Sequence, residues 1–493
     1  MHANNSLGLG LVLGVVFAGA AFGAMRYVNV SNATPAAPHT SWATAATNIQ
    51  QAINWANSGD EVWVAPGDYR SADYVQIPSG KTLLLRGLLG RAAVINAQYN
   101  GPALIVSGTN SVVSGFTVKN GYNPNNYGGG IYLSAPSTVT NCLVTSNWAN
   151  GGAGISIHAS GARVVNSTIT GNRAGESGGG VMFYNRSTGH IANCEISFNT
   201  ASNSGGGVYV QYAGAISNCW IVDNRALNGS GGGVHLYQGG RVVNSVAIGN
   251  SASNRGGGIY ARYGGGEIAH CTVADNTSDT EGGGVWIANT CTAGNNIVYY
   301  NVAPTLGNFY ASQSTASNNC TIPAVGSGCV TNDPQFTFRS TRTLTLQATS
   351  PCVDAGANAY GLATDYEGNP RPVAGTEFGA AKYDMGAYEF QAGWDAGYTS
   401  IGGGWRRLTW FGDYVGMGGG WIWHNKHGFM YPTATSTRSD IWFYTQDMGW
   451  LWTANATYPF LYRSSPAAWL WYNGATNPRW FRNMATGQWE SRP

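Results

Sequence analysis

Residues 205–260 read GGGVYVQYAGAISNCWIVDNRALNGSGGGVHLYQGGRVVNSVAIGNSASNRGGGIY, and they contain the same pattern three times. In each instance a glycine-rich triplet precedes a branched apolar residue. Working outward from this stretch, the pattern recurs seven times at intervals of 24 to 27 residues, with the apolar residue at Ile131, Ile155, Val181, Val208, Val234, Ile259 and Val285. A fixed period of this length indicates a repeat architecture, in which each repeat buries its apolar face against its neighbours.

A second series of residues follows the same period. It consists of asparagines at intervals of 25 to 27 residues, namely Asn120, Asn147, Asn172, Asn199, Asn224, Asn250, Asn276 and Asn301. A period near 26 fits one coil of a parallel β-helix, and the alternation after each triplet predicts a strand with one buried face. We expect the glycines at one corner of each coil and the asparagines stacked as a structural amide ladder at another.

Cysteines occupy a third column, five residues before the ladder asparagines. Cys142, Cys194, Cys219 and Cys271 are expected to be small, buried side chains there, and the absence of a CxxC pair or a histidine column argues against a metal site. Cys194 and Cys219 are one coil apart and could be bridged. Cys320 and Cys329, nine residues apart around a Gly-Ser-Gly turn, are better disulfide candidates.

The composition narrows the class of protein. Of the 493 residues, 71 are glycine and only 10% are charged, and the net charge is +2. Ordinary soluble domains have roughly 25% charged residues and about 7% glycine. This charge balance predicts no nucleic-acid partner, and the 43% of hydrophobic residues exclude a charged, disordered chain.

The N-terminus predicts export. Residues 7–22 are apolar, and Ala21-Phe22-Gly23 offers a signal-peptidase site after residue 23, so residues 1–23 are expected to be a signal peptide or, alternatively, an N-terminal anchor. The expected location is therefore secreted, extracellular or at the cell surface.

Three segments carry a family resemblance. Thr47 to Tyr69 (TNIQQAINWANSGDEVWVAPGDY) resembles the capping helix and first coil of pectate-lyase-like right-handed β-helix proteins. The GGG-[IV] and [IV]-x-x-N repeats resemble those of bacterial polymorphic outer-membrane proteins, and residues 364–390 resemble the closing segment of secreted β-helix proteins. The resemblance implies a right-handed parallel β-helix over residues 24–390. These families include lyases, hydrolases, adhesins and spacers, so the fold leaves the function open.

Catalytic relatives of this fold place several carboxylates on one face. In this sequence the nearest match is Asp223 and Asp275, each one residue before a ladder asparagine and two coils, about 9.6 Å, apart. His235 and Arg262 are the basic residues that could join them. Asp residues beside a turn Asn are more often structural. We expect no cofactor or metal, with calcium needed only under the lyase alternative.

The outward positions of the repeat strands are rich in aromatic residues. The residue after each repeat apolar is expected to face solvent, as is the one two positions further along. The resulting stripe comprises Tyr132, Tyr184, Tyr209, His235, Tyr237, Tyr260, Arg262 and Trp286. Aromatic rings spaced along a face suit a linear polysaccharide, although they are also good strand formers and another domain or subunit could cover them.

After residue 390 the composition changes. Twelve of the 18 tryptophans lie between Trp394 and Trp489, in short alternating segments separated by polar turns. This pattern predicts antiparallel β-hairpins over residues 391–493. The hairpins resemble aromatic repeats of wall-associated modules in bacterial surface proteins, which implies a role in attachment, glycan binding or assembly.

The sequence favours a non-catalytic, exported β-helix protein that acts as an adhesin or scaffold and contacts a polysaccharide or another cell-envelope component. Two alternatives remain open. One is a secreted polysaccharide lyase or glycoside hydrolase acting on a linear acidic glycan. The other is a subunit of a self-assembling surface fibre.

Overall fold

The computed structural model describes residues 23–70, 73–347, 349–358, 361–373, 381–390, 394, 399–418, 420–433, 436 and 440–492. The predicted export segment lies outside these ranges except for Gly23. The chain forms two compact units, the first within Met1–Gly175 and Gly180–His190 and the second within Glu176–Gly179 and Ile191–Pro493. Among the described residues, no helix has the length and apolar character that a membrane span requires.

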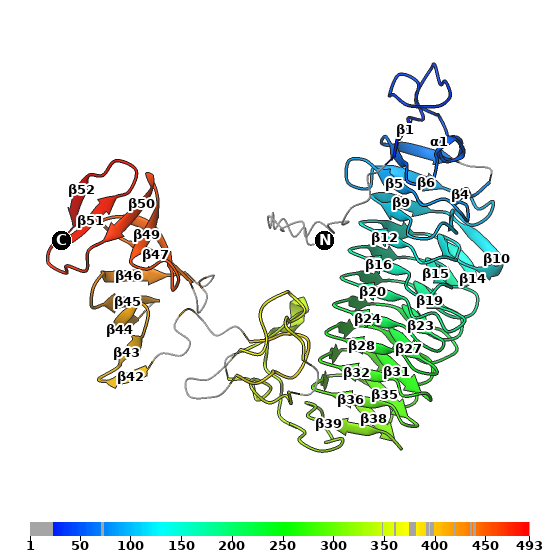
Figure 1. Ribbon diagram of the computed structural model, residues 1–493. Helices are drawn as coiled ribbons and strands as arrows, with labels where there is room; N and C mark the ends of the chain where they lie inside the picture. The colour runs from blue at the N-terminus through cyan, green and yellow to red at the C-terminus, as the bar shows by residue number, and fades with distance from the viewer. Residues whose placement is uncertain are drawn as a thin grey trace. The chain divides into compact units, whose positions relative to one another are not determined.

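The first unit is a stack of coils whose short strands pair in parallel, as Figure 1 shows. Its first sheet contains β1 (Met25–Val28), β2 (Glu61–Val64), β5 (Leu84–Gly87), β8 (Val112–Ser114), β12 (Thr138–Thr140) and β16 (Arg163–Val165). Its second sheet contains β3 (Gly67–Arg70), β6 (Ala93–Asn96), β9 (Phe116–Lys119), β13 (Leu143–Thr145) and β17 (Thr168–Thr170). Its third sheet contains β4 (Val75–Ile77), β7 (Leu104–Val106), β11 (Ile131–Leu133), β15 (Ile155–Ile157) and β19 (Val181–Phe183). Corner strands β10 (Tyr122–Tyr127), β14 (Trp148–Gly151) and β18 (Arg173–Ala174) complete the coils.

The second unit repeats this arrangement, with β20 (His190–Ala192) at the division. Its first sheet contains β24 (Ala215–Ser217), β28 (Arg241–Val243), β32 (Glu267–Ala269), β36 (Thr292–Gly294) and β39 (Thr315–Ser317). Its second sheet contains β21 (Glu195–Ser197), β25 (Trp220–Val222), β29 (Val246–Ile248), β33 (Thr272–Ala274) and β37 (Ile297–Tyr299). Its third sheet contains β23 (Val208–Val210), β27 (Val234–Leu236), β31 (Ile259–Arg262), β35 (Val285–Ala288) and β38 (Phe309–Ser312). Its corner strands are β22 (Thr200–Ala201), β26 (Arg225–Ala226), β30 (Ser251–Ala252) and β34 (Thr277–Ser278).

The coil register follows the sequence repeat, so the predicted parallel β-helix is confirmed. In one coil of the first unit, the inward residues Ile131, Val139, Val144 and Ala149 are fully buried. Ile131 pairs with Ile155 of the next coil, at the spacing of the glycine triplets. A Cβ added at Gly129 would lie 2.3 Å from the carbonyl oxygen of Trp148, so the triplet is needed for close approach between coils.

The ladder asparagines are hydrogen-bonded from coil to coil. In the second unit, Asn224 Nδ2 donates to Asn250 Oδ1 at 3.0 Å, and Asn250 Nδ2 donates to Asn276 Oδ1 at 2.9 Å. Each side-chain oxygen also accepts the backbone N–H of the asparagine one coil earlier. Asn120, near the start of the series, is half-buried and donates to Asn96. The series is thus an internal polar spine that links neighbouring coils within each unit.

The first unit begins with the expected capping helix. Helix α1 (Ile49–Trp55) is N-capped by Asn48, whose side chain accepts the N–H groups of Gln50 and Gln51. Its apolar residues Ile49, Ala52 and Ile53 are buried. The helix therefore covers the apolar interior next to the first strands, as the Thr47–Tyr69 segment predicted.

The described residues between 330 and 390 form a second core on the outer side of the second sheet. They include the hairpin of β40 (Phe336–Phe338) and β41 (Thr343–Leu346), joined by the 3-10 turn η1 (Arg339–Thr341). Leu344, Leu346, Met385 and Tyr388 pack against outward residues of β25, β29 and β37, among them Val222, Val246, Ile248 and Ile297. The part of the predicted closing segment between residues 374 and 380 lies outside the described residues.

The Trp-rich region forms an antiparallel sheet, which confirms the predicted hairpins. Its strands are β42 (Thr399–Gly402), β43 (Trp405–Leu408), β44 (Gly412–Gly418), β45 (Trp421–His424), β46 (Gly428–Pro432), β47 (Asp440–Thr445), β48 (Gly449–Ala454), β49 (Phe460–Ser464), β50 (Ala467–Tyr472), β51 (Arg479–Asn483) and β52 (Trp489–Arg492). Alternate residues such as Phe443, Leu451 and Leu470 form one buried core. The strands are drawn from yellow-orange to red in Figure 1.

Candidate functional site

The two predicted acids stand in one column, but each is already paired. Asp223 follows β25 and accepts two hydrogen bonds from Arg342, at 2.8 and 2.9 Å. Asp275 follows β33 and forms an ion pair with Arg339. Arg339 begins the η1 turn and Arg342 directly follows it. The side-chain hydrogen bonds to Asp275 and Asp223 raise the pKa of Arg339 and of Arg342. These ion pairs fasten η1 to the second sheet and leave no unpaired acid in the column.

The two predicted basic residues lie on a different sheet. His235 is in β27 and Arg262 is in β31, both in the third sheet, whereas the acids follow second-sheet strands. His235 is buried, its Nδ1 lies 3.2 Å from the carbonyl oxygen of Ser230, and burial lowers its pKa to about 4. Arg262 lies over the ring of Tyr263. The structure therefore does not bring the four candidates together. In the described part of the chain, no group of three or more His, Cys, Asp or Glu could hold a metal ion.

Part of the predicted stripe is buried, which corrects the expectation that all of it faces solvent. In the second unit, His235, Tyr260 and Trp286 are only 5 to 7% exposed. The turn before each strand folds back over the outward residue, so that a Cβ on Gly256 would lie 2.8 Å from Tyr260 Cβ. Trp286 Nε1 also donates to Glu281 at 3.2 Å, and Arg255 lies over the Trp286 ring. Of the stripe, only Tyr237 is exposed, while Tyr132, Tyr184, Tyr209 and Arg262 are intermediate.

The three buried rings of the stripe belong to a column of stacked rings that Tyr209 and Tyr310, both partly buried, extend at its two ends. Successive centroids of Tyr209, His235, Tyr260, Trp286 and Tyr310 are separated by 5.0, 4.6, 4.7 and 5.2 Å. The last three rings are nearly parallel, with interplanar angles of 12° and 4°. This spacing follows from the coil repeat, because equivalent residues on neighbouring parallel strands are about 4.8 Å apart. The column stabilises the stack of coils and offers little surface to a ligand.

The first unit has its own aromatic cluster around His158. The ring of His158 lies 4.5 Å from that of Tyr132, 4.9 Å from Tyr184 and 5.5 Å from Tyr127. Its Nε2 is 2.8 Å from the Oγ of Ser156, and burial lowers the pKa of His158 to about 4. Ser156 is fully buried, so this pair is not presented to a substrate.

None of the eight cysteines is disulfide-bonded in the structure. Cys142, Cys194, Cys219 and Cys271 are buried, as predicted. The structure does not join Cys320 to Cys329, because the two sulfurs have different surroundings. Cys320 is buried and its sulfur lies 3.4 Å from the carbonyl oxygen of Asn332, whereas the Cys329 sulfur lies 2.7 Å from the carbonyl oxygen of Val325.

Exposed aromatic residues gather instead on one face of the C-terminal antiparallel sheet. This outer aromatic face consists of side chains that are 38 to 51% exposed, namely Trp423, Phe429, Tyr431, Trp450, Phe460, Trp469, Trp480 and Trp489. The strand period explains it, because β47 to β51 alternate buried residues with more exposed ones. Both faces of each strand are therefore apolar, but only the inner one has a partner within the sheet.

Contacts between strands hold the outer aromatic face together. Trp469 lies 5.6 Å from Tyr462 and 6.0 Å from Trp452, and Trp471 lies 5.8 Å from Trp489, measured between ring centroids. Trp423 meets Phe429 at 4.8 Å across β45 and β46. Such edge-to-face pairs are favourable arrangements for aromatic rings and fix their orientation. Part of the tryptophan content of residues 391–493 therefore lies at the surface and not in the core of the sheet.

The inner side of this sheet contains two buried histidines. His424 is fully buried, and burial together with Lys426 lowers its pKa to about 3. Burial, with the neighbouring His424, lowers the pKa of His427 well below its ordinary value. Both histidines are therefore neutral in the folded sheet, whereas in an unfolded chain each takes up a proton near pH 6.5.

We expect this sheet to lose stability as the pH falls below about 6.5, because protons then bind only the unfolded histidines. Stability is fully present above that pH and falls progressively towards pH 3. At pH 5 each histidine accounts for a loss of about 2 kcal/mol. Urea unfolding of the full chain, followed by tryptophan fluorescence, measures the effect. His424→Asn, whose Oδ1 replaces the acceptor Nδ1, should reduce the slope by about one proton. An unchanged slope would contradict the assignment.

Comparison with known proteins supports the fold. Residues 102–265 match the family model described as a right handed beta helix region. A pectate lyase, Pel9A, has a similar structure at 17% sequence identity, with a TM-score of 0.54 over 75% of this chain and 97% of the lyase. An alginate lyase of family PL6 matches at 14% identity, with a TM-score of 0.36 over 61% of this chain and 54% of that one. The Dettilon tailspike protein matches at 12% identity, with a TM-score of 0.35 over 62% of this chain and 68% of that one. No curated protein sequence matches the chain.

The chain is thus a right-handed parallel β-helix followed by a Trp-rich antiparallel sheet. At 17% identity, the similarity to the pectate lyase establishes the fold and nothing more.

Proposed function

We propose that this chain is a non-catalytic, extracellular glycan-binding protein, a β-helix scaffold that attaches to polysaccharide through the outer aromatic face. The observation that carries the proposal is the set of exposed rings held in fixed orientation on the sheet. Pyranose rings have apolar C–H faces, and an exposed indole or phenol offers a flat surface for them. Contiguous exposed apolar patches on soluble proteins commonly mark interaction sites.

The state of the acids supports a binding role over a catalytic one. A glycosidase or lyase needs carboxylates or a base available to the substrate. Here Asp223 and Asp275 are engaged by Arg342 and Arg339, and His235 is buried on another sheet. The known pectate and alginate lyases with this fold are the reason to test both substrates directly. We propose that binding needs no calcium.

The proposal is tested with purified full-length protein on a panel of insoluble and soluble polysaccharides, including pectate and alginate, with calcium and with chelator. We expect retention by at least one polysaccharide without formation of unsaturated product. Trp469→Ala combined with Trp489→Ala should weaken retention about tenfold or more, since aromatic anchors dominate such interfaces.

Phe198→Ala provides the matched control, because Phe198 is 61% exposed but lies on the β-helix. It should bind as the unchanged protein does. Equal loss in both variants, or no retention on any polysaccharide, would contradict the proposal. Ultraviolet-absorbing unsaturated product from pectate or alginate would overturn it in favour of a lyase.

A further inference from the structure

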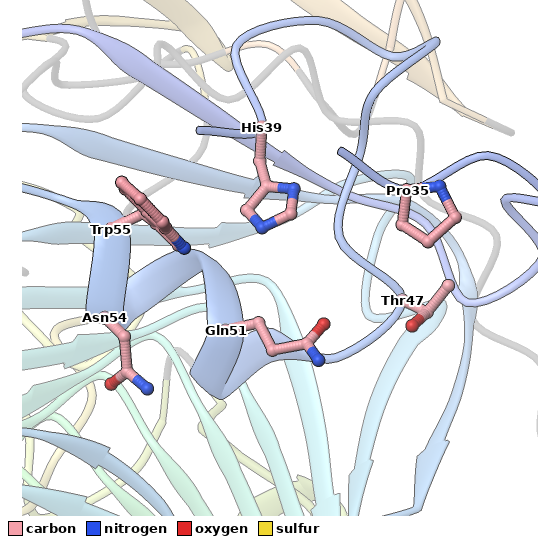
Figure 2. A pocket seen from close by; sticks show the side chains of 6 residues that line it. All are labelled: Pro35, His39, Thr47, Gln51, Asn54 and Trp55. Carbon is pink, nitrogen blue, oxygen red and sulfur yellow. The ribbon is translucent and has the colours of Figure 1, made fainter. Parts of the chain in front are cut away.

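A small polar cavity lies beside the N-terminal cap, away from the surfaces described above. It has a volume of about 280 Å³ and is lined by Pro35, His39, Thr47, Gln51, Asn54 and Trp55. Figure 2 shows that two segments build it. Helix α1 carries Gln51, Asn54 and Trp55, and the loop before the helix carries Pro35, His39 and Thr47. The His39 ring points into the space between Trp55 and Pro35, with Gln51 opposite it.

The loop side of the cavity is held rigidly. His39 is 6% exposed, and its Nδ1 lies 3.0 Å from the carbonyl oxygen of Thr44. Its backbone N–H donates to Ala36 at 3.0 Å, and its carbonyl accepts the Tyr27 N–H of β1 at 2.8 Å. Because His39 Nδ1 donates to the carbonyl of Thr44, Nε2 is the acceptor in the neutral ring. Figure 2 shows this side of the ring facing the cavity.

The helix side is fixed by bonds to the first coils. Gln50 exchanges two hydrogen bonds with the backbone of Gln76, at 2.7 and 3.2 Å. Lys81 Nζ donates to the carbonyls of Ile53 and Asn54, and Arg26 Nε donates to the carbonyl of Trp55. The cavity is therefore formed in advance, which lowers the entropic cost of binding.

Two of the polar side chains that line the cavity are not used by the fold, whereas His39 Nδ1 bonds the carbonyl of Thr44 and Asn54 Oδ1 accepts from Gln50 Nε2. Trp55 is 53% exposed, and the side-chain amide of Gln51 and the indole N–H of Trp55 have no hydrogen-bond partner among the described residues. No Asp, Glu, Lys or Arg lines the space. The nearby charges are engaged elsewhere, since Arg26 pairs with Asp60 at 3.1 Å and Lys81 binds carbonyls.

We propose that this cavity binds one neutral pyranose residue, stacked on Trp55 with its hydroxyls on Gln51 and His39. The volume lies just below the ~300 Å³ at which pockets for drug-sized molecules begin, so it suits one ring and not an oligosaccharide. An anionic sugar finds no Lys or Arg side chain there. A quaternary ammonium ligand needs several aromatic walls, and the cavity has one. This inference does not depend on the proposed role of the outer aromatic face.

The test uses the full-length protein and ligand-observed saturation-transfer NMR. The probes are the methyl pyranosides of glucose, galactose and mannose, N-acetylglucosamine, galacturonic acid and choline. We expect at least one neutral sugar to bind, with no signal from galacturonic acid or choline. Trp55→Ala and, separately, Gln51→Ala should weaken that binding about tenfold or more.

Trp42→Ala is the matched control, because Trp42 is 42% exposed in the same loop region but packs edge-on against Tyr27 outside the cavity. It should leave binding unchanged, and circular dichroism should show that every variant is folded. Binding of only an anionic or ammonium probe, no binding of any probe, or equal losses in Trp42→Ala and Trp55→Ala would overturn the proposal. Trp469→Ala with Trp489→Ala should retain the monosaccharide signal, so failure of this site is distinguishable from failure of the outer aromatic face.

Discussion

Replacing Asn250 by leucine is expected to lower the free energy of unfolding of the β-helix by about 4 kcal/mol. Asn250 is fully buried and serves both neighbouring coils. It accepts hydrogen bonds from Asn224 and donates to Asn276 and to the carbonyl of Ile221, all at 2.9 to 3.0 Å. Leucine leaves these partners buried and unpaired, which costs more than a hydrogen bond contributes.

The measurement is guanidinium unfolding of the full chain, followed by far-ultraviolet circular dichroism. Asn120→Gly is the control. Asn120 is half-buried, has a positive φ of 58° that glycine accepts, and donates one side-chain bond to Asn96. Loss of this hydrogen bond should lower the free energy of unfolding by about 1 kcal/mol or less. If Asn250→Leu and Asn120→Gly lowered the free energy of unfolding by similar amounts, Asn250 would contribute no more to stability than an ordinary corner residue.

The second large effect is expected at Arg371, where methionine should destabilise the 330–390 segment by about 3 to 5 kcal/mol. Arg371 and Glu389 form an ion pair at 3.1 Å with both side chains fully buried. The guanidinium also donates to Asn244 and to the carbonyls of Asp384 and Gly386. Without it, a buried carboxylate remains unpaired. Burial, with Glu389, already raises the pKa of nearby Asp384.

Limited proteolysis of the native protein measures release of this segment, and guanidinium unfolding measures its free energy. Arg407→Met is the control, because the Arg407–Asp413 pair has side chains 54 and 20% exposed, and solvent-screened surface pairs contribute little to stability. Adding Glu389→Leu to Arg371→Met should recover part of the stability, since it removes the unpaired charge. If Arg371→Met were no more sensitive to protease than Arg407→Met, the role of the buried pair would be refuted.

The repeat period predicts the fold well because it reports local, recurring constraints. Val208, Val234 and Ile259 are buried in the strands where the glycine triplets predict them. The same period does not predict whether the outward-pointing residues are exposed to solvent. Alternation shows that Tyr260 points away from the interior, but not that the turn at Gly256 folds over it. That contact depends on the path of the corner between strands.

Contacts across long sequence distances account for the other differences. Arg342 meets Asp223 from 119 residues away, and no local pattern connects them. A signal for the second core was nevertheless present, because β29 has Val246 and Ile248 at outward positions where β17 of the first unit has Thr168 and Thr170. Apolar residues on both faces of a strand imply a cover on each. The cavity beside α1 was missed because His39 reaches it from a loop without periodicity.

The asparagine spine has a consequence for how such a chain can evolve. Asn224, Asn250 and Asn276 are spaced by 26 residues, and the side chain of each joins its coil to the coil before and the coil after. A tandem duplication or deletion of one such interval leaves every bond type intact and changes the stack by about 4.8 Å. The β-helix can thus change its length in evolution by whole coils, whereas an insertion shorter than one coil would interrupt the asparagine spine. Homologues should differ by integral numbers of coils, so the length of the β-helix should vary among them in discrete steps.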